Sequence, residues 1–284
     1  QMYRPEPNSC NSGAVVMLAG FSGTMDSSLA PFAEAISNAG LMAVMFDYRH
    51  FGASEGEPRQ YVSVPRQLRD AAAVLAYVRG RSDVNAAQVG IWSSSFGGGL
   101  GVHTAINDGN IKALVAQCPL LDNWRTTMMG IADRSWIQNL QLMVMALWAA
   151  GMSFFGRHGP SIPITHPKRL CMFTSDEAQR VHQITGPLWR NELVLQSILR
   201  GRLHSNHALS VAHKLNVPTL IQICDQDRTV SNVGIEAFVD KASTRITTTH
   251  YDCGHFDIYL PPHVDGAATE ASRRAGGHAS AARH

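Results

Sequence analysis

The sequence predicts an α/β fold, in which a mostly parallel, doubly wound sheet carries an inserted helical cap. Short apolar runs bounded by turn residues recur along the chain, and such runs are typical of strands buried on both faces. Amphipathic helical stretches lie between most of these runs, an alternation typical of a parallel sheet with helices on both sides. The alternation stops once, over residues 122–213, where helical sequence without a clear strand has the size of a cap or lid.

The individual elements follow in order from the N-terminus. Gln1–Pro7 resembles the end of a strand. Helices are predicted at Leu29–Gly40, which closes on a glycine, at Val64–Arg81, and over the glycine-rich stretch after Ser95. The expected strands of the sheet are Ala14–Gly20, Leu41–Arg49, Val89–Ser94, Ile111–Pro119, Val217–Asp225 and Thr244–Asp252.

These elements divide the chain into three parts. Residues 1–121 and 214–265 should form the core, and residues 122–213 should form a cap that selects the substrate without supplying catalytic groups. The stretch from 266 to 284 is small and polar, so we expect a disordered tail. Because the chain begins at Gln1 rather than Met, we also expect upstream residues to be missing from it.

The composition favours a folded protein with a small-molecule substrate. The 284 residues are 45% hydrophobic and 16% charged, and 24 Lys and Arg against 22 Asp and Glu give a formal charge of +2. No basic run offers a stripe for phosphates, so nucleic acid is not an expected partner. The five cysteines are widely spaced without a CxxC pair, which predicts neither a disulfide framework nor a metal site. We expect a reducing, cytoplasmic environment, and whether two copies form a homodimer stays open.

One segment of the predicted cap, Ser135–Phe155, is long and apolar enough to suggest a membrane span. Gln138, Asn139 and Gln141 interrupt it and Gly151 weakens it, so a cap helix facing the substrate is the preferred interpretation and an ordinary core helix the alternative. Its methionines and tryptophans would suit an adaptable apolar pocket.

A strand, a tight turn and a helix follow one another in VGIWSSSFGGGLG, Val89–Gly101. A nucleophile presented on such a turn has a strained backbone, and the residues two positions away on each side must be small so that strand and helix can approach. Ser93 and Gly97 meet this requirement around Ser95. The motif alone fits a glycine-rich turn without chemistry equally well, so the interpretation depends on partners elsewhere.

Suitable partners follow in the order that this fold requires. A serine hydroxyl becomes nucleophilic when a histidine takes its proton, and a carboxylate fixes the tautomer of that histidine. Asp227 comes just after the predicted strand Val217–Asp225, and His255 just after the next strand. The chain order of Ser95, Asp227 and His255 therefore predicts a nucleophile, an acid and a base on loops at one edge of the sheet.

Four segments in this order resemble the α/β-hydrolase fold family of serine hydrolases, and the resemblance covers about residues 14–121 and 216–259. The segments similar to the family's oxyanion loop, its D-x-R-x-x-G-x-S-x-G segment, its nucleophile elbow and its histidine loop are AGFSGT (Ala19–Thr24), FDYRHFGASEGEPR (Phe46–Arg59), WSSSFGGG (Trp92–Gly99) and CGHFDIY (Cys253–Tyr259). The resemblance implies that the amides of Phe21 and Phe96 form an oxyanion hole. Two departures are Ala19, where the family often has histidine, and Ser93, where it usually has glycine.

Other acidic and basic residues compete for these roles. Asp225 and Asp122 also lie near strand ends and could orient His255, but the Asp227 loop is more similar to the family's acid loop, and Asp225 is expected to shape that loop.

Two further pairs of polar residues have a structural interpretation. Asp47 and Arg49 are expected to form a buried ion pair behind the elbow. His204 and His207 could be read as a metal pair, but without a clear third ligand a solvated helix face is the preferred interpretation.

The resemblance implies a serine hydrolase that cleaves an acyl bond through an acyl-enzyme intermediate, without a cofactor. The apolar cap favours a carboxylic ester with an apolar acyl or alcohol part. Thioesterase or other acyl-releasing activity, an X-Pro or aminopeptidase-like activity, and a catalytically silent ligand-binding protein stay open as alternatives. The residues expected to line the substrate pocket are Ser22, Trp124, Met145 and Trp148.

Overall fold

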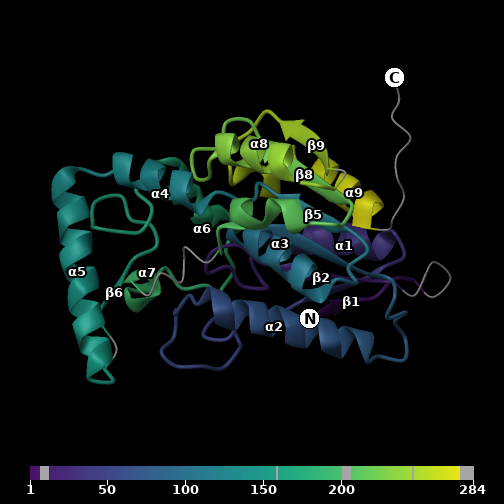
Figure 1. The fold of residues 1–284 in the computed structure, drawn as a ribbon, viewed down its shortest axis with the longest axis horizontal. Helices are drawn as coiled ribbons and strands as arrows, with labels where there is room; N and C mark the ends of the chain where they lie inside the picture. Colours follow the sequence, from purple (N-terminus) through teal and green to yellow (C-terminus); the bar gives the residue numbers. More distant parts are fainter. Residues whose placement is uncertain (7–12, 158, 200–205, 245, 276–284) are drawn as a thin grey trace.

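A computed structural model of the chain describes residues 1–6, 13–157, 159–199, 206–244 and 246–275. At its centre lies a seven-stranded sheet in the order β1-β3-β2-β4-β5-β8-β9 (Figure 1). The strands are β1 (Met2–Tyr3), β2 (Ala14–Leu18), β3 (Met42–Met45), β4 (Val89–Ser94), β5 (Leu114–Gln117), β8 (Thr219–Cys224) and β9 (Ile246–Tyr251). All neighbouring strands are parallel except β1, which pairs antiparallel with β3 at one edge. The predicted mostly parallel sheet is confirmed.

Helices cover both faces of the sheet. On one face lie α1 (Ala30–Asn38) and α9 (Val264–Ala275), and on the other lie α2 (Val64–Arg79), α3 (Phe96–Asp108) and α8 (Asn232–Lys241). Strand β2 shows how one apolar run serves both layers, because alternate side chains point to opposite faces. Val15 and Met17 belong to the apolar cluster beneath α1 and α9, whereas Val16 and Leu18 belong to the cluster beneath α2 and α3.

Strand β9 differs from the expectation of a strand buried on both faces. Thr247, Thr248 and His250 are exposed. β9 is the last strand of the sheet and pairs only with β8 among the described strands, so one edge and part of its faces meet solvent.

The residues between β5 and β8 form the inserted segment, which extends to one side of the sheet with α5 as its outermost helix (Figure 1). Its elements are α4 (Asn123–Ala132), α5 (Trp136–Phe154), β6 (Ser161–Ile162), η1 (Glu177–Arg180), α6 (Val181–Ile184), β7 (Leu193–Val194), α7 (Gln196–Leu199) and η3 (Ala208–Lys214). The expectation of a segment without strands was wrong, because β6 and β7 pair antiparallel. Two residues are too short for a side-chain period to show in the sequence.

Helix α5 begins with a capping box, in which the Ser135 hydroxyl accepts a hydrogen bond from the Gln138 amide and the Gln138 side chain accepts one from the Ser135 amide. Its outward side leaves large apolar groups in solvent, and Trp136 is 74% exposed. Among the described residues, no helix is long and apolar enough to cross a membrane.

The C-terminal stretch corrects the expectation of a disordered tail from residue 266 onward. Residues up to 275 belong to α9, and Ala267, Ala268 and Ala271 are buried in the cluster that also holds the apolar side chains of α1. Alanine is the best helix former, and its small side chain lets two helices approach closely. The small-residue composition therefore reflects close packing here. Residues 276–284 lie outside the described residues.

Overpacking this helix interface should destabilise the fold. We expect Ala271→Leu to lower the free energy of unfolding by about 1–3 kcal/mol, because extra methylenes must enter a closely packed layer. Gly266→Ala is the matched control, since a Cβ on Gly266 meets no atom within 4 Å; it should leave the protein equally stable or more stable, by up to about 1 kcal/mol. Urea unfolding measures both, and equal stability of Ala271→Leu and wild type would show that α9 does not pack as described.

Candidate active site

Ser95 lies in a strained turn between β4 and α3. Its backbone has φ 53° and ψ −124°, a conformation that residues with a side chain rarely adopt. The turn is tight because the start of α3 packs against the end of β2. A Cβ atom on Gly97 would overlap the carbonyl oxygens of Leu18 and Ala19. This turn leaves Ser95 partly exposed between buried neighbours.

Ser93 occupies the position where the family usually has glycine. Its hydroxyl donates a hydrogen bond to the carbonyl of Val115 at 3.0 Å. The side chain faces Gly101 of α3, where a Cβ would come within 2.6 Å of the Ser93 oxygen. Serine fits at position 93 because Gly101 leaves it room.

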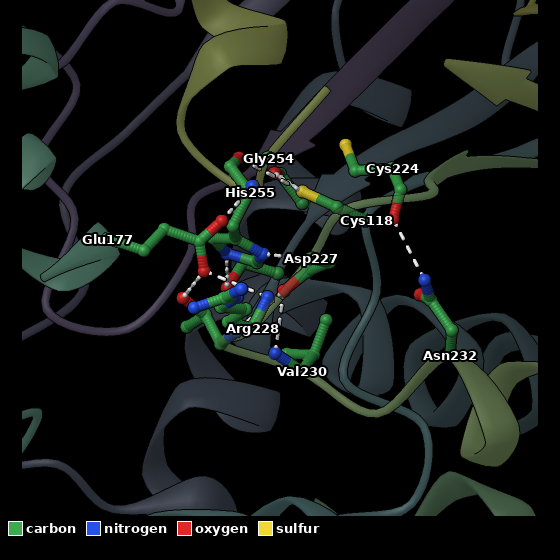
Figure 2. Close-up of polar contacts among 12 residues, drawn as sticks. Cys118, Glu177, Cys224, Asp227, Arg228, Val230, Asn232, Gly254 and His255 are labelled. Atoms are coloured by element: carbon green, nitrogen blue, oxygen red, sulfur yellow. Dashed lines mark hydrogen bonds and ion pairs between the residues drawn. The ribbon is translucent and has the colours of Figure 1, made fainter. Parts of the chain in front are cut away.

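The structure brings Ser95, Asp227 and His255 together at the carboxyl ends of β4, β8 and β9. The Nε2 atom of His255 lies 2.9 Å from the Ser95 hydroxyl oxygen, and its Nδ1 atom lies 2.6 Å from Oδ2 of Asp227. The other oxygen of Asp227 accepts hydrogen bonds from the amides of Thr229 and Val230 at 2.7 and 2.8 Å. Figure 2 shows Asp227 between Val230 and His255. A continuous hydrogen-bond chain therefore runs from Ser95 to the backbone after β8.

The histidine and the carboxylate of this chain are shielded from water, since their side chains are 2% and 0% exposed. Burial alone would lower the pKa of His255, because it disfavours the imidazolium. The adjacent Asp227 carboxylate and the Cys118 side chain act in the opposite direction, and together they outweigh burial. The pKa of His255 is therefore raised well above its ordinary value of 6.5.

The two predicted oxyanion positions flank Ser95. Phe96 is the first residue of α3, so its amide is among those that a helix leaves without an internal partner. The loop before Phe21 also touches the serine, because a Cβ on Gly20 would lie 3.1 Å from the Ser95 Cβ and 3.6 Å from its hydroxyl oxygen. The Phe21 ring meets the Phe96 ring edge to face at a centroid distance of 5.5 Å. Phe96 and the loop that carries Phe21 therefore lie beside Ser95.

Two cavities meet at this site. A small cavity of about 80 Å³ contains Ser95 and His255 in its wall and lies between the sheet and the inserted segment. A larger cavity of about 490 Å³ has a mostly apolar wall, to which α4 and α5 contribute. Phe21, Phe173 and Thr229 line both cavities. One extended ligand could therefore reach from Ser95 into the inserted segment.

The four residues predicted to line the substrate pocket lie elsewhere. Ser22 is buried and accepts a hydrogen bond from the Trp189 indole, while Trp124 and Trp148 are exposed. Met145 packs in a small cluster with Ala149, Ile162 and Leu195. The face of α5 that lines the cavity carries Asn139, Leu142, Met143, Ala146 and Leu147. The sequence could not show which face points inward, because α5 is apolar almost all round.

The competing acids occupy other places. Asp225 is exposed and lies 2.7 Å from Nδ1 of His250. Asp122 caps α4, where it accepts a hydrogen bond from the Arg125 amide at 3.1 Å and pairs with the Arg125 guanidinium at 2.6 Å. Asp227 is the acid that contacts His255 among these three.

The expected ion pair between Asp47 and Arg49 is not formed. Asp47 accepts hydrogen bonds from the amides of Met25 and Ala53 at 2.7 and 2.8 Å. Arg49 pairs with Asp70 on α2 instead, with Nε and Oδ1 2.7 Å apart. Each charged side chain bonds groups on the element that lies next to it in the fold. The neighbouring residues in the sequence do not indicate these partners.

Only one histidine of the pair considered as a metal site lies among the described residues. His207 lies 3.6 Å from Asp122, and His204 is outside the described residues. In the described part of the chain no three His, Cys, Asp or Glu side chains are arranged to hold a metal ion.

One residue at the site carried no signal in the sequence. Glu177, in the inserted segment, accepts a hydrogen bond from the backbone amide of His255 at 2.7 Å (Figure 2). Its second oxygen accepts hydrogen bonds from the Arg228 amide at 2.9 Å and the Thr229 hydroxyl at 2.8 Å. Glu177 belongs to none of the four motifs, so only the folded chain places it beside the loops after β8 and β9.

Comparison with known proteins finds a matching family and relatives of this chain. The family of α/β hydrolases described as serine aminopeptidase, S33, matches residues 9–256. The chain is 30% identical over 267 residues to the quorum-quenching protein AidA of Acinetobacter baumannii, covering 91% of this chain and 84% of that protein. It is 27% identical over 144 residues to the thiohydrolase aneE of Aspergillus aculeatus, covering 50% of this chain and 45% of that one.

Solved structures with this fold include DcsB in complex with its substrate analogue and the monoacylglycerol lipase of Paleococcus ferrophilus. DcsB superposes with a TM-score of 0.80 at 19% identity, covering 96% of this chain and 92% of that one. The lipase gives 0.71 at 17% identity and covers 98% of both chains. At these identities the likeness establishes the fold.

The raised pKa of His255 can be measured directly. We expect the His255 imidazole to titrate above about pH 6.5, because Asp227 stabilises its charged form. In Asp227→Asn the burial remains and the charge is lost, so the midpoint should move to lower pH. NMR titration of histidine-labelled protein measures both values, with His255→Gln to assign the signal among the 13 histidines. A wild-type midpoint at or below 6.5 would contradict the described pairing.

Proposed function

The chain belongs to the α/β-hydrolase family described as serine aminopeptidase, S33, and we propose that it hydrolyses a carboxylic ester with a large apolar part. Family membership makes it a hydrolase; the ester is the proposal. The observation that carries the proposal is the hydrogen-bond chain from Ser95 through His255 to the buried Asp227. A silent binding protein would have no need of a strained serine aligned with a histidine and a carboxylate.

In the proposed mechanism, the Ser95 oxygen attacks the acyl carbon while Nε2 of His255 accepts the hydroxyl proton. Asp227 holds Nδ1 and stabilises the imidazolium. The amides of Phe21 and Phe96 stabilise the oxyanion, a contribution on the order of 2.7–4 kcal/mol per donor. His255 then gives its proton to the leaving alcohol. A water molecule, deprotonated by His255, attacks the acyl enzyme, and the acid leaves as Ser95 regains its proton.

The two cavities support a substrate with unequal parts. The cavity of about 490 Å³ can hold a long or bulky apolar group, whereas the cavity of about 80 Å³ at Ser95 leaves room for a small group. In this proposal residues 122–213 are a cap, because this segment provides most of the apolar residues in the wall of the larger cavity. The raised pKa of His255 implies that activity is lost as the pH falls through that value, since the protonated ring cannot act as a base.

A thioester is the second candidate, since the same mechanism releases a thiol and a relative is named a thiohydrolase. An aminopeptidase substrate has less support. A free amino group would need a carboxylate nearby, and Asp133 is the one acidic residue that the described cavity walls contain. The cytoplasm stays the proposed location, which the free thiols of Cys118, Cys171, Cys224 and Cys253 support.

Covalent labelling tests the proposed nucleophile. We expect a fluorophosphonate to modify Ser95 alone, because His255 activates only that hydroxyl, and mass spectrometry locates the adduct. Ser95→Ala should not be labelled, whereas Ser27→Ala, a buried serine whose hydroxyl bonds Thr24, should still be labelled. An adduct on Ser93 or Ser94, or labelling of Ser95→Ala, would refute the assignment.

Narrowing the larger cavity tests the proposed substrate. Ala146 is buried in its wall, so Ala146→Leu should lower kcat/KM for a long-chain ester by about 10- to 200-fold and spare an acetyl ester. Trp148→Ala is the matched control on the same helix, because Trp148 is 58% exposed and away from the described cavity walls. The assay compares both variants on acyl esters, thioesters and aminoacyl amides. Equal losses on long and short esters would contradict the assignment of this cavity to the apolar group.

A further inference from the structure

We propose that Glu177 is a positioning residue. Through its carboxylate, the inserted segment holds the acid loop, which follows β8 and carries Asp227, in register with the histidine loop, which follows β9 and carries His255. The inference rests on the proposed function of Ser95, Asp227 and His255. It changes the role of the segment, because the cap then helps to assemble the catalytic groups as well as to enclose the substrate.

The carboxylate of Glu177 bridges the acid loop and the histidine loop, which the Gln226 amide also joins by a hydrogen bond to the Cys253 carbonyl at 3.1 Å. One oxygen accepts from the His255 amide at 2.7 Å, and the other accepts from the Arg228 amide at 2.9 Å and the Thr229 hydroxyl at 2.8 Å. Arg228 and Thr229 directly follow Asp227, and the Thr229 amide itself donates to Asp227. Glu177 therefore fixes the backbone on both sides of the hydrogen bond between Asp227 and His255.

A carboxylate suits this position better than any neutral group. All three partners are donors, and a carboxylate accepts on both oxygens without donating. An amide in its place would turn one oxygen into a donor NH₂ group, which would face the Arg228 amide or the His255 amide. Hydrogen bonds to a charged acceptor are also about twice as strong as neutral ones.

The histidine loop is shaped to receive this carboxylate. A Cβ on Gly254 would come within 2.5 Å of Oε1 of Glu177, so a side chain at position 254 would displace the carboxylate (Figure 2). The same short helix makes a second link to the loop, because Arg180 pairs with Asp257. Asp257 in turn accepts a hydrogen bond from the Gly254 amide at 3.1 Å.

The bridge is also continuous with the larger cavity. Thr174 and Ser175, just before η1, line that cavity, and so do Arg228 and Thr229 from the other side of the bridge. A ligand that fills the cavity would contact residues at both ends of the link. Its binding should favour the arrangement in which Asp227 and His255 are aligned.

Several titratable groups surround His255 and define what a pH measurement would report. Besides Asp227 and Glu177, these are Cys118, whose Sγ lies 3.9 Å from the His255 carbonyl, the buried Tyr259, and the Asp257–Arg180 ion pair. Burial raises the pKa of Tyr259, so that group stays neutral at physiological pH. Asp227 and Cys118 both raise the pKa of His255, Asp227 the more, so displacing Asp227 would affect the charge state of His255 most.

The test compares Glu177→Gln, Gly254→Ala and their double variant with wild type. Asp176→Asn is the matched control, because Asp176 is an exposed carboxylate next to Glu177. We expect Glu177→Gln to lower kcat for an acetyl ester by about 10- to 100-fold with little change in KM, since the cost is misalignment of bound groups. The His255 imidazole titration and the acid limb of kcat/KM should both move to lower pH, because Asp227 is held less closely. Gly254→Ala should do the same by displacing the carboxylate, and the double variant should lose little more than either single one.

Each outcome is decisive. A folded Glu177→Gln protein with wild-type kcat and an unmoved His255 titration would overturn the inference while Ser95 labelling kept the proposed function intact. If wild type showed neither labelling nor ester hydrolysis, the proposed function would fail, yet the NMR titration would still decide whether Glu177 positions His255. A lower thermal stability with an unchanged pH profile would assign Glu177 a purely structural role and also overturn the inference. If Glu177→Gln does not fold, Gly254→Ala supplies the same comparison.

Discussion

The strained turn at Ser95 is the constraint on which the rest of the site depends. A left-handed backbone at a serine is unfavourable, and it persists because β4 and α3 are both fixed by burial on either side of it. The approach of α3 to β2 demands glycine at position 97, and Ser93 is accommodated because position 101 is also glycine. The glycines after the elbow thus serve close backbone contact, and the strain they permit directs one hydroxyl toward His255.

A parallel sheet makes the second contribution. Parallel strands end at the same edge, so the loops after β4, β8 and β9 meet although they are far apart in the sequence. The side chains of His255 and Asp227 are almost fully buried, and buried charges and hydrogen bonds act strongly. Burial lowers the pKa of His255, whereas Asp227 and Cys118 raise it, and together these two outweigh burial. The hydrogen bond between Nδ1 and Asp227 orients the imidazole for the role we propose.

The inserted segment contributes both to the larger cavity and to the hydrogen bonds that support the acid and histidine loops. Its apolar helices α4 and α5 enclose the larger cavity, and its short helix η1 brings Glu177 to the backbone of the acid and histidine loops. The sequence predicts a segment that selects the substrate without supplying catalytic groups. The three groups of the proposed triad do come from the core, but their supporting hydrogen bonds cross into the segment.

By itself the sequence determined the sheet, the elbow and the loops that carry Ser95, Asp227 and His255, because apolar periodicity, turn glycines and motif order are local properties. It could not determine which face of α5 points inward, because a helix that is apolar on all sides shows no periodic pattern in its sequence. Met143 and Leu147 line the cavity, whereas Met145 and Trp148 do not. Nor could the sequence show that Arg49 pairs with Asp70, that Ala267 and Ala271 belong to a buried helix, or that Glu177 reaches His255. Those outcomes depend on contacts between residues distant in sequence, and only the packing of the folded chain decides them.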